Sequence, residues 1–532
     1  MIRVYNTSSR QKEDFITIDP NVARIYVCGP TTYNYIHLGN ARPLVVFDTI
    51  RRYLIYRGYK VIYVQNFTDV DDKIINRANE EGVEAHELAQ RYIEEYFKDA
   101  DALNVMRADK YPKVSEHIPE IIQVISTLVE KGHGYVRESD VFFGVATFPE
   151  YGKLSGRSLD DMLSGARVEV DARKEQPVDF ALWKKAKPGE PSWESPWGKG
   201  RPGWHIECSV MSTKYLGMTF DIHGGGADLI FPHHENEIAQ AEAFSDRPFV
   251  KYWLHNGFIT VNREKMSKSL GNFFVVRDIL DKYPAEVVRL YLLSTHYRSP
   301  LDFDNTKLDE AGKALDRLRN SRAILEEAMV KAEKVAGLPA DVELAREIAD
   351  LGAKFVEAMD DDFNTALAFS QVFNLARLIN RYLAGGIINS LGTLEDAARL
   401  FDDFLEVLGL NLKTVADDAS ERVDESVVGE IILDLVEFRK KARQEKDYRT
   451  GDLLRDLLYN NGISLEDYKE GSRVKFESEP VLSSLMADIL ALRADLRKEK
   501  AFTRADQLRD ILNQYEIVID DTREGSSWRF KA

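Results

Sequence analysis

The sequence predicts an α/β protein with a doubly wound, Rossmann-like parallel sheet that carries an insertion, followed by an α-helical bundle and duplicated small C-terminal domains. Three observations lead to this prediction. A strand–turn–helix–strand pattern lies near the N-terminus, helical sequence fills residues 305–409, and a segment near the C-terminus repeats at an offset of 54 residues. The first pattern is the usual opening of a parallel sheet.

The first predicted unit starts with residues 24–28, a β-branched and aromatic run typical of a buried strand. A glycine–proline turn follows, and apolar residues at helical spacing then run from His37 to Gly58. A second strand is predicted over residues 60–64. We therefore expect a helix to begin near the end of the first strand, at the edge where doubly wound sheets bind their ligands.

The predicted sheet is divided into two halves. Residues 75–130 are mainly helical in pattern, whereas residues 132–203 break into short pieces rich in Gly, Pro and Trp, as an insertion would. Strand signals return at residues 219–223 and 253–261. The predicted boundaries are 1–131 for the first half, 132–203 for the connective insertion and 204–304 for the second half.

The rest of the chain is predicted to be a helical bundle over residues 305–415 and two copies of a small domain. Glu445-Lys446 recurs as Glu499-Lys500, and the apolar spacing before each pair also matches. Two copies are too few for a solenoid, which needs about three or more repeats. We therefore predict one domain of two helices and a hairpin over residues 427–477 and a second one over residues 480–532.

Composition indicates a cytoplasmic enzyme with no membrane partner. A chain of 532 residues is too long for a single core. No apolar stretch approaches the ~18 residues that cross a bilayer, and the N-terminus lacks the layout of a signal peptide. The net charge of −17 argues against nucleic acid, but it is an average over the whole chain and leaves room for a basic face.

Four residues favour a metal site. Cys28 and Cys208 are the only two cysteines, and His233 and Glu237 stand four residues apart on one face of a predicted helix. Taken alone, the two cysteines are explained equally well as inert buried thiols, and the His233/Glu237 pair is explained better as a solvated helix face. Cys28 ends the first predicted strand, however, and strand ends meet at the ligand crevice. Two thiolates, an imidazole and a carboxylate suit zinc, whereas the His-Glu-x-x-His motif of zinc hydrolases is absent.

A second group of residues fits phosphate binding. Residues 37–40, His-Leu-Gly-Asn, open the first long helix, where free N–H groups and the helix dipole bind anions. Lys265 and Lys268 lie in Lys-Met-Ser-Lys-Ser directly after a predicted strand, where they would neutralise charge on a leaving phosphate group. Taken alone, these are a capped helix and a solvated loop. The signatures of P-loop and dinucleotide-binding proteins are absent.

Together these motifs resemble those of the class I aminoacyl-tRNA synthetases, since residues 37–40 are similar to the "HIGH" signature and residues 265–269 match "KMSKS" in full. Longer segments narrow the resemblance to the cysteinyl-tRNA synthetase family over residues 1–477. These segments are Tyr26 to Thr31, Phe67 to Lys73, Pro202 to Ser209, His223 to Asp228 and Phe231 to Gln240.

The resemblance implies an enzyme that makes cysteinyl-adenylate from L-cysteine and ATP and transfers the cysteinyl group to the terminal ribose of tRNA(Cys). It implies one Zn²⁺ on Cys28, Cys208, His233 and Glu237, with His234 beside them, and Mg²⁺ with ATP. A monomer is expected. The implied catalytic and ATP-binding residues are His37, Gly39, Asn40, Asp228, Lys265 and Lys268, and the implied cysteine-binding residues are Cys28, Gly29, Thr68 and Trp204.

One departure from the signature is Asn40, which stands where the "HIGH" pattern has its last histidine. Asparagine still offers an N–H donor but cannot become cationic. The second departure is the repeat, because either copy could read the anticodon. Copy one is favoured because it follows the bundle directly. The candidate anticodon residues are Arg443, Tyr448, Asp452 and Asp467 in copy one and Arg497, Phe502, Asp506, Asp521 and Trp528 in copy two.

Two alternative functions share these motifs. A synthetase-like cysteine ligase would make the same adenylate but pass cysteine to a small amine, and such a protein would have no use for the C-terminal domains. A non-catalytic RNA-binding relative would have no need of the intact Lys265–Ser269 loop or of four metal-binding side chains. Cysteine-dependent exchange between ATP and pyrophosphate, followed by charging of tRNA, would separate the three.

Overall fold

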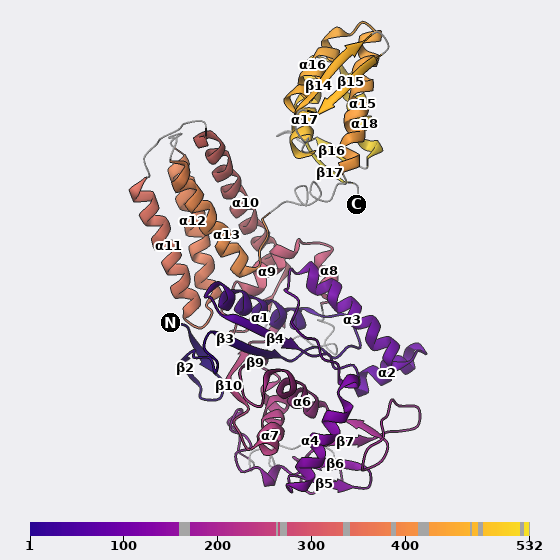
Figure 1. Ribbon diagram of the computed structural model, residues 1–532, viewed down its shortest axis with the longest axis vertical. Helices are drawn as coiled ribbons and strands as arrows, with labels where there is room; N and C mark the ends of the chain where they lie inside the picture. The colour runs from indigo at the N-terminus through magenta and orange to yellow at the C-terminus, as the bar shows by residue number, and fades with distance from the viewer. Residues whose placement is uncertain are drawn as a thin grey trace. The chain divides into compact units, whose positions relative to one another are not determined.

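The computed structural model describes residues 1–158, 171–261, 264–265, 274–333, 341–384, 390–412, 425–468, 471–476, 482–515, 517–521 and 526–530. Contacts divide the chain into two compact units, residues 1–411 and residues 412–532 (Figure 1). The domain boundaries predicted within these units remain predictions.

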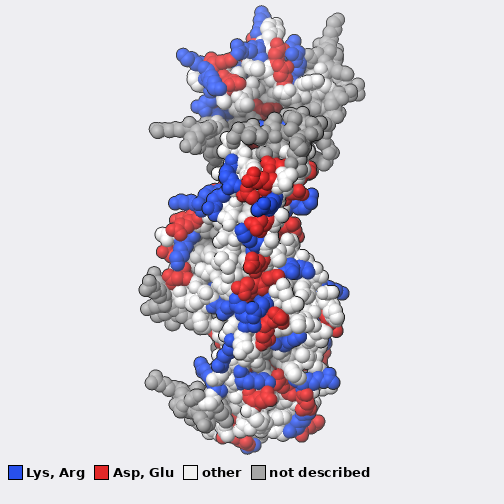
Figure 2. All heavy atoms as spheres, turned by 90° about the vertical axis from the view of Figure 1, so that its left-hand side faces the viewer, with Lys and Arg blue, Asp and Glu red and all other residues white. Residues whose placement is uncertain are grey.

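On the face shown in Figure 2, basic and acidic side chains are interspersed.

A four-stranded parallel sheet forms the centre of the first unit, which confirms the predicted fold class. Its order is β10-β9-β3-β4, so the chain moves one way from β3 to β4 and the other way from β9 to β10. The topological switch point therefore lies between β3 and β9, where ligands are expected. The strands are β3 (Val22–Val27), β4 (Lys60–Gln65), β9 (Phe220–Gly226) and β10 (Val250–Asn256).

Helices cover both faces of this sheet. In Figure 1, α1 lies above it, and α6 and α7 lie below. The buried side of α1 carries Leu44, Phe47 and Ile50, the apolar residues whose spacing predicted this helix. The helices of this region are α1 (Leu38–Tyr56), α2 (Asp72–Glu81), α3 (Ala85–Ala102), α4 (Ile118–Glu130), α6 (Trp204–Leu216) and α7 (Glu235–Ser245), with short turns η1 (Val114–Glu116), η2 (Val145–Thr147) and η3 (Ile230–His234).

Three smaller sheets complete the first half of the chain. One antiparallel sheet lies within the predicted insertion and runs in the order β5-β6-β7-β8. A hairpin at the N-terminus and a sheet after β10 were not predicted. The strands are β1 (Arg3–Asn6), β2 (Gln11–Asp14), β5 (Gly134–Arg137), β6 (Asp140–Phe143), β7 (Phe180–Lys185), β8 (Gly200–Pro202), β11 (Ile259–Val261), β12 (Glu264–Lys265) and β13 (Leu301–Phe303).

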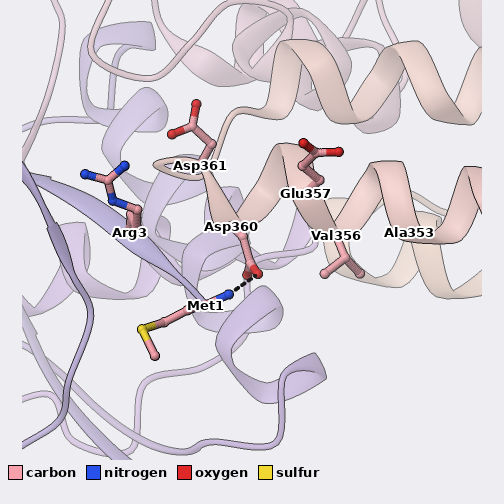
Figure 3. Close-up of a pocket in the computed structure, with 7 residues that line it drawn as sticks. All are labelled: Met1, Arg3, Ala353, Val356, Glu357, Asp360 and Asp361. Carbon is pink, nitrogen blue, oxygen red and sulfur yellow. Dashed lines mark hydrogen bonds and ion pairs between the residues drawn. The ribbon is translucent and has the colours of Figure 1, made fainter.

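A helical bundle follows, as predicted. Its helices are α8 (Val276–Leu280), α9 (Ala285–Leu293), α10 (Asn305–Glu333), α11 (Val342–Asp360), α12 (Thr365–Leu383) and α13 (Leu391–Leu408). The turn after α11 fastens the bundle to the N-terminal hairpin. The amino group of Met1 donates to Asp360 at 3.2 Å, as Figure 3 shows. The buried carboxylate of Asp362 accepts from the backbone N–H of Tyr5 at 2.8 Å and from Arg298 at 2.7 Å.

A buried arginine joins the bundle to the helix that begins at the ligand edge. Arg289 of α9 donates to Asp48 of α1 at 2.6 Å and to the carbonyl of Leu408 at the end of α13 at 3.1 Å. The side chain of Arg289 is 0% exposed and that of Asp48 is 1% exposed.

Among the described helices, none combines the length and the apolar character needed to cross a bilayer.

The second unit contains both copies of the repeat. Each copy has two helices followed by an antiparallel hairpin, and the apolar residues of both copies form one core. Copy one comprises α15 (Glu425–Gln444), α16 (Tyr448–Asn460), β14 (Ile463–Tyr468) and β15 (Gly471–Phe476). Copy two comprises α17 (Leu482–Lys498), α18 (Phe502–Gln514), β16 (Ile517–Asp521) and β17 (Ser526–Phe530).

Candidate active site and metal centre

A cavity of about 350 Å³ lies at the carboxyl ends of the parallel strands, where the topology places a ligand. Several chain segments converge on it, among them the residues that follow β3, the start of α1, and the residues at and after the ends of β9 and β10. The lining residues that these segments contribute include Cys28, Gly29, His37, Gly39, Asn40, Gly226, Asp228, Asn256 and Phe258, and Trp204 adds a side chain from α6.

The four predicted metal ligands meet beside this cavity, which Cys28 lines. Their donor atoms lie within 4.8 Å of one another. The Cys28 Sγ atom lies 3.8 Å from Cys208 Sγ and 3.6 Å from Glu237 Oε1, and His233 Nε2 lies 3.0 Å from the same oxygen. Zinc bonds of about 2.0–2.3 Å in a tetrahedron would separate donor atoms by roughly 3.3–3.8 Å. The residues therefore fit a four-coordinate metal ion.

A ring of further histidines surrounds these ligands, and sequence reasoning singled out only His234 among them. His223 Nε2 lies 2.9 Å from Glu237 Oε2, and His234 Nε2 lies 3.3 Å from Cys28 Sγ. Cys28, His223, His234 and Glu237 consequently form a second set of donor atoms within the same 4.8 Å limit. The signal was present, since His223 stands on a predicted strand in the motif His-Gly-Gly-Gly-Ala-Asp.

The electrostatics of this cluster favour a positive charge among the donor atoms. Burial acts to raise the pKa of Glu237, but the charges of His223 and His233 and their hydrogen bonds outweigh it and lower that pKa to about 2. Burial disfavours the protonated form of His233, yet Glu237 and Cys208 raise its pKa to about 10. A hydrogen bond from Cys28 outweighs burial and lowers the pKa of Cys208 to about 6. A divalent cation would supply this positive charge directly.

Neighbouring side chains fix the orientation of the predicted ligands. The ring of Trp204 stacks on the imidazole of His233, with centroids 4.2 Å apart. On the other edge of that imidazole, His205 Nδ1 lies 2.8 Å from His233 Nδ1. Both contacts leave Nε2 of His233 directed at Glu237. A metal-binding imidazole is held in this way, with its ring and its other nitrogen fixed by neighbours.

Two predicted cysteine-binding residues differ in what they contact. Gly29 lines the cavity and also passes close to the neighbouring strand end, since a Cβ atom on it would lie 1.6 Å from the carbonyl oxygen of Asn66. Thr68 is buried and donates to the carboxyl of Glu207 at 3.0 Å. Burial raises the pKa of Glu207 well above its usual value. Thr68 is not among the described residues that line the cavity, so its contact with substrate remains a prediction.

The N-terminus of α1 also lines the cavity, through His37, Gly39 and Asn40. The side-chain oxygen of Asn40 accepts from the backbone N–H of His37 at 3.2 Å. This contact orients Asn40, because its oxygen is engaged and its amide nitrogen becomes the end that can donate to a phosphate. Asp228 is implied as the ribose-binding residue. Its carboxylate lies so close to Gly226 that a Cβ atom on that glycine would stand 2.4 Å from the carboxylate oxygen.

The two ends of the predicted lysine loop are attached near the same helix start. Leu38 N–H donates to the carbonyl of Phe274 at 3.0 Å, directly after the loop. On the other side, β12 pairs with β11, which places the backbone of Lys265 beside Thr260. The side chain of Lys265 and the whole of Lys268 lie outside the described residues, so their roles remain predictions.

The candidate anticodon residues lie in the second unit. In copy one, Arg443 lies 3.6 Å from Asp452 and its guanidinium stands 5.9 Å from the ring centre of Tyr448. In copy two, Asp506 pairs with Arg509 at 3.2 Å, and Trp528 is half-buried against the shared core. Phe502 is exposed, and so is Arg497. The side chains of Asp467 and Asp521 lie outside the described residues.

The fold defines a class of protein. The methionyl-tRNA synthetase of Mycobacterium tuberculosis, in complex with methionyl-adenylate, aligns with a TM-score of 0.55 at 15% identity over 73% of this chain and 89% of its own. The family described as "tRNA synthetases class I (C) catalytic domain" matches residues 14–313, and the "DALR domain" matches residues 354–413. This is the architecture of a class I aminoacyl-tRNA synthetase.

Sequence similarity specifies the family within that class. The cysteine–tRNA ligase of Desulforamulus reducens is 58% identical over 490 residues, covering 89% of this chain and 99% of the relative. That of Carboxydothermus hydrogenoformans is 56% identical over 480 residues, covering 89% and 100%. The chain belongs to the cysteine–tRNA ligase family. Each of these alignments leaves 11% of this chain uncovered. That share is about the length of one repeat copy, since copy two has 53 of the 532 residues.

Proposed function

We propose that this chain activates L-cysteine with ATP and transfers it to tRNA(Cys), with Zn²⁺ bound by Cys28, Cys208, His233 and Glu237. One observation carries the proposal. Four metal-binding side chains cluster beside a cavity that Cys28, one of the four, lines together with His37, Gly39 and Asn40 of the signature helix start. An amino acid held at the metal-binding cluster would thus lie near a triphosphate held at the helix start.

The donor set supports zinc as the ion. Thiolate and imidazole ligands suit Zn²⁺ better than Mg²⁺ or Ca²⁺, which prefer oxygen. When bound, zinc would supply a strong attraction for the thiolate of cysteine and a weak one for the hydroxyl of serine. Shape alone discriminates such small differences by only about 1–3 kcal/mol, so the donor set accounts for selectivity that the walls of the cavity could not provide.

The remaining residues would position the reactants for adenylate formation. The cysteine carboxylate would attack the α-phosphorus of ATP, and the bond from that phosphorus to the bridging oxygen of pyrophosphate would break. The N–H groups at the start of α1, His37 and the amide of Asn40 would hold the phosphates there. Lys265 and Lys268 would stabilise the charge that develops on pyrophosphate, together with Mg²⁺ bound to ATP. This step requires no protein nucleophile, because position and charge supply the rate.

In the second step, a hydroxyl of the terminal ribose of the tRNA would attack the carbonyl carbon of the adenylate. The carbon–oxygen bond to phosphate would break, AMP would leave, and the hydroxyl proton would pass to a phosphate oxygen or to water. The helical bundle, which contains the region matched by the DALR domain, and the C-terminal unit supply the surface expected to hold the tRNA. The presence of the helical bundle and of the C-terminal unit favours transfer to tRNA over transfer to a small amine.

The proposal is tested by exchange of labelled pyrophosphate into ATP in the presence of cysteine, serine or no amino acid, followed by charging of a tRNA(Cys) transcript. We expect exchange with cysteine alone and charging of the transcript. Exchange without charging would favour a cysteine ligase that uses another acceptor. Absence of exchange from a metal-loaded protein would contradict the proposal.

A further inference from the structure

The two C-terminal copies are built as an internal pseudo-symmetric pair. Helix α15 packs against α18, and its counterpart α17 packs against α16. The shared core takes equivalent residues from both copies, for example Ile431 with Leu485 and Leu458 with Leu512, each pair being 54 positions apart. Exchange of the two copies therefore reproduces the same packing, as it does across a two-fold interface.

Polar contacts between the copies repeat the same symmetry. Arg504 of copy two donates to Glu445 of copy one at 2.8 Å, and Arg449 of copy one pairs with Glu499. The two glutamates are equivalent positions, whereas the two arginines are offset by one residue in the repeat. At the other end of the helices, Asn461 bonds to Asp488 at 2.7 Å, while Tyr515 bonds to Asp434 at 2.8 Å, and these two partners are again equivalent positions.

These contacts place the starts of α16 and α18 side by side. Arg504 also donates to Asp447 at 3.0 Å, the residue immediately before α16. Tyr448 and Phe502 are the first residues of the two helices and are equivalent in the repeat. Their side chains are 56% and 54% exposed. Two exposed aromatic residues thus stand at neighbouring helix starts, one from each copy.

The backbone next to each ring has an unusual conformation that is the same in both copies. Lys446 has φ of 65° and Lys500 has φ of 63°. This left-handed position at a helix end is normally taken by glycine, because a side chain there is disfavoured. Both lysines are exposed, and neither pairs with a carboxylate in the part of the chain that the structure describes. Stability alone would favour glycine at both positions.

The charge of this surface is also biased. Its carboxylates Glu445, Asp447 and Glu499 are paired with two arginines from the opposite copy, because Arg504 holds the first two and Arg449 the third. With Lys446 and Lys500 added, these seven side chains carry one net positive charge, and the two lysines are the cations that no carboxylate pairs in the described part of the chain. Exposed aromatic rings next to cations are the features that bind unpaired nucleotides, since bases stack on the rings and phosphates approach the cations.

We propose that the two copies form one composite binding surface for unpaired nucleotides of tRNA(Cys), with Tyr448, Phe502, Lys446 and Lys500 as its contact residues. This inference rests on the proposed function, because the tRNA is the RNA that the chain would charge. It replaces the choice between copy one and copy two as reader, because the residues of both copies meet on the same surface.

The lysines give the sharper test, because a structural role and a binding role predict opposite results. In K446G/K500G, glycine suits the left-handed backbone, so the melting temperature should stay the same or rise. Binding of a labelled tRNA(Cys) transcript should weaken, and the slope of log K against log salt should fall by about one to two. Cysteine-dependent exchange should not change. Wild-type affinity and salt slope in this variant would overturn the proposal.

The aromatic residues test whether both copies contribute. Y448A and F502A should each weaken binding of the transcript by about five- to a hundredfold, as loss of one stacked base would. The control is Y459A, which removes a ring that is 70% exposed at the opposite end of α16, and it should bind like the wild type. If F502A and K500G alone bind normally while Y448A and K446G do not, copy one reads the RNA by itself and the composite surface is wrong. A wild-type chain that bound no tRNA(Cys) would instead contradict the proposed function.

Discussion

His223 Nε2 lies 2.9 Å from one carboxylate oxygen of Glu237, while His233 Nε2 lies 3.0 Å from the other. Glu237 is therefore held from two sides in a site from which water is excluded, and its two oxygens serve different neighbours. Such a carboxylate can keep one oxygen on a metal ion while the second anchors it to the protein. The arrangement makes the position of Glu237 independent of the substrate.

The metal centre predicts a combined loss of ion and activity. Purified protein should hold about one zinc ion per chain, because the two sets of four donor atoms share Cys28 and Glu237 and cannot both be filled. Cys208→Ser removes a thiolate at the centre and should abolish both zinc content and cysteine-dependent exchange, as measured by elemental analysis and pyrophosphate exchange. A C208S protein that lost zinc yet still preferred cysteine over serine by orders of magnitude would refute the role of the metal in selection.

The predicted lysine loop should act on the rate of adenylate formation. Lys268→Ala should slow cysteine-dependent exchange by about a hundredfold or more, because it removes a charge that matters most as pyrophosphate leaves. The KM for cysteine should change little. The matched control is Lys251→Ala. Lys251 is exposed and lies near the start of β10, whereas the cavity lies at the end of that strand, so this variant should exchange normally. An unchanged rate in K268A would exclude this role.

The buried Arg289–Asp48 pair should be important for stability. Arg289→Ala leaves Asp48 without one of its two arginine partners and leaves the carbonyl of Leu408 without its donor, so we expect a loss of about 3–5 kcal/mol. Urea unfolding can be followed by tryptophan fluorescence, since five of the six tryptophans lie in residues 1–411. The control Arg381→Ala breaks an exposed pair with Glu347 and should cost less than about 1 kcal/mol.

His296 should make stability depend on pH. Burial lowers its pKa below the ordinary value of 6.5, and the nearby charge of Asp362 compensates only in part. Below pH 6.5 the unfolded chain therefore takes up a proton that the folded chain refuses, so stability falls as the solution is acidified. Replacement by asparagine should reduce the slope of unfolding free energy against pH just below 6.5 by up to about 1.4 kcal/mol per pH unit. Identical slopes in the two proteins would contradict this account.

Removal of residues 480–532 should damage copy one, because its apolar residues lie in a core that copy two completes. Limited proteolysis should cut residues 425–476 rapidly in the truncated chain and slowly in the full chain. Exchange with cysteine should persist, since the cavity lies in the other unit, while charging of tRNA(Cys) should fall. A truncated chain with a protease-resistant copy one would show that the copies fold independently.

Local signals were sufficient to predict the sheet and the residues of the metal centre. The strand that ends before Cys28 and the helix that starts at His37 follow from periodicity over a few residues, and the topology of doubly wound sheets then brings remote strand ends together. The ring of histidines was only partly foreseen. A single buried histidine such as His223 has no periodic signature, and its partner Glu237 comes from another element.

Contacts between distant elements explain most of what could not be predicted. Arg289 would normally be assigned to the surface, because an arginine is buried only when remote partners satisfy it. The common core of the two repeats was also missed, since an apolar helix face predicts burial without specifying the surface that covers it. Reasoning from each copy separately therefore led to a choice between readers, whereas the structure joins the copies in one unit.

The pairing of β3 with β9 has a consequence for how this chain is made. Val27, next to Cys28, pairs in parallel with Gly224 of β9, far along the chain, so a very long loop must close before the two strands meet. The antiparallel sheet between them, β5 to β8, involves shorter connections and can form earlier. During synthesis, the edge of β3 that pairs with β9 must wait until the ribosome has released residues beyond Gly226. Slow or interrupted translation of that interval would leave an exposed strand edge, which is a known route to aggregation.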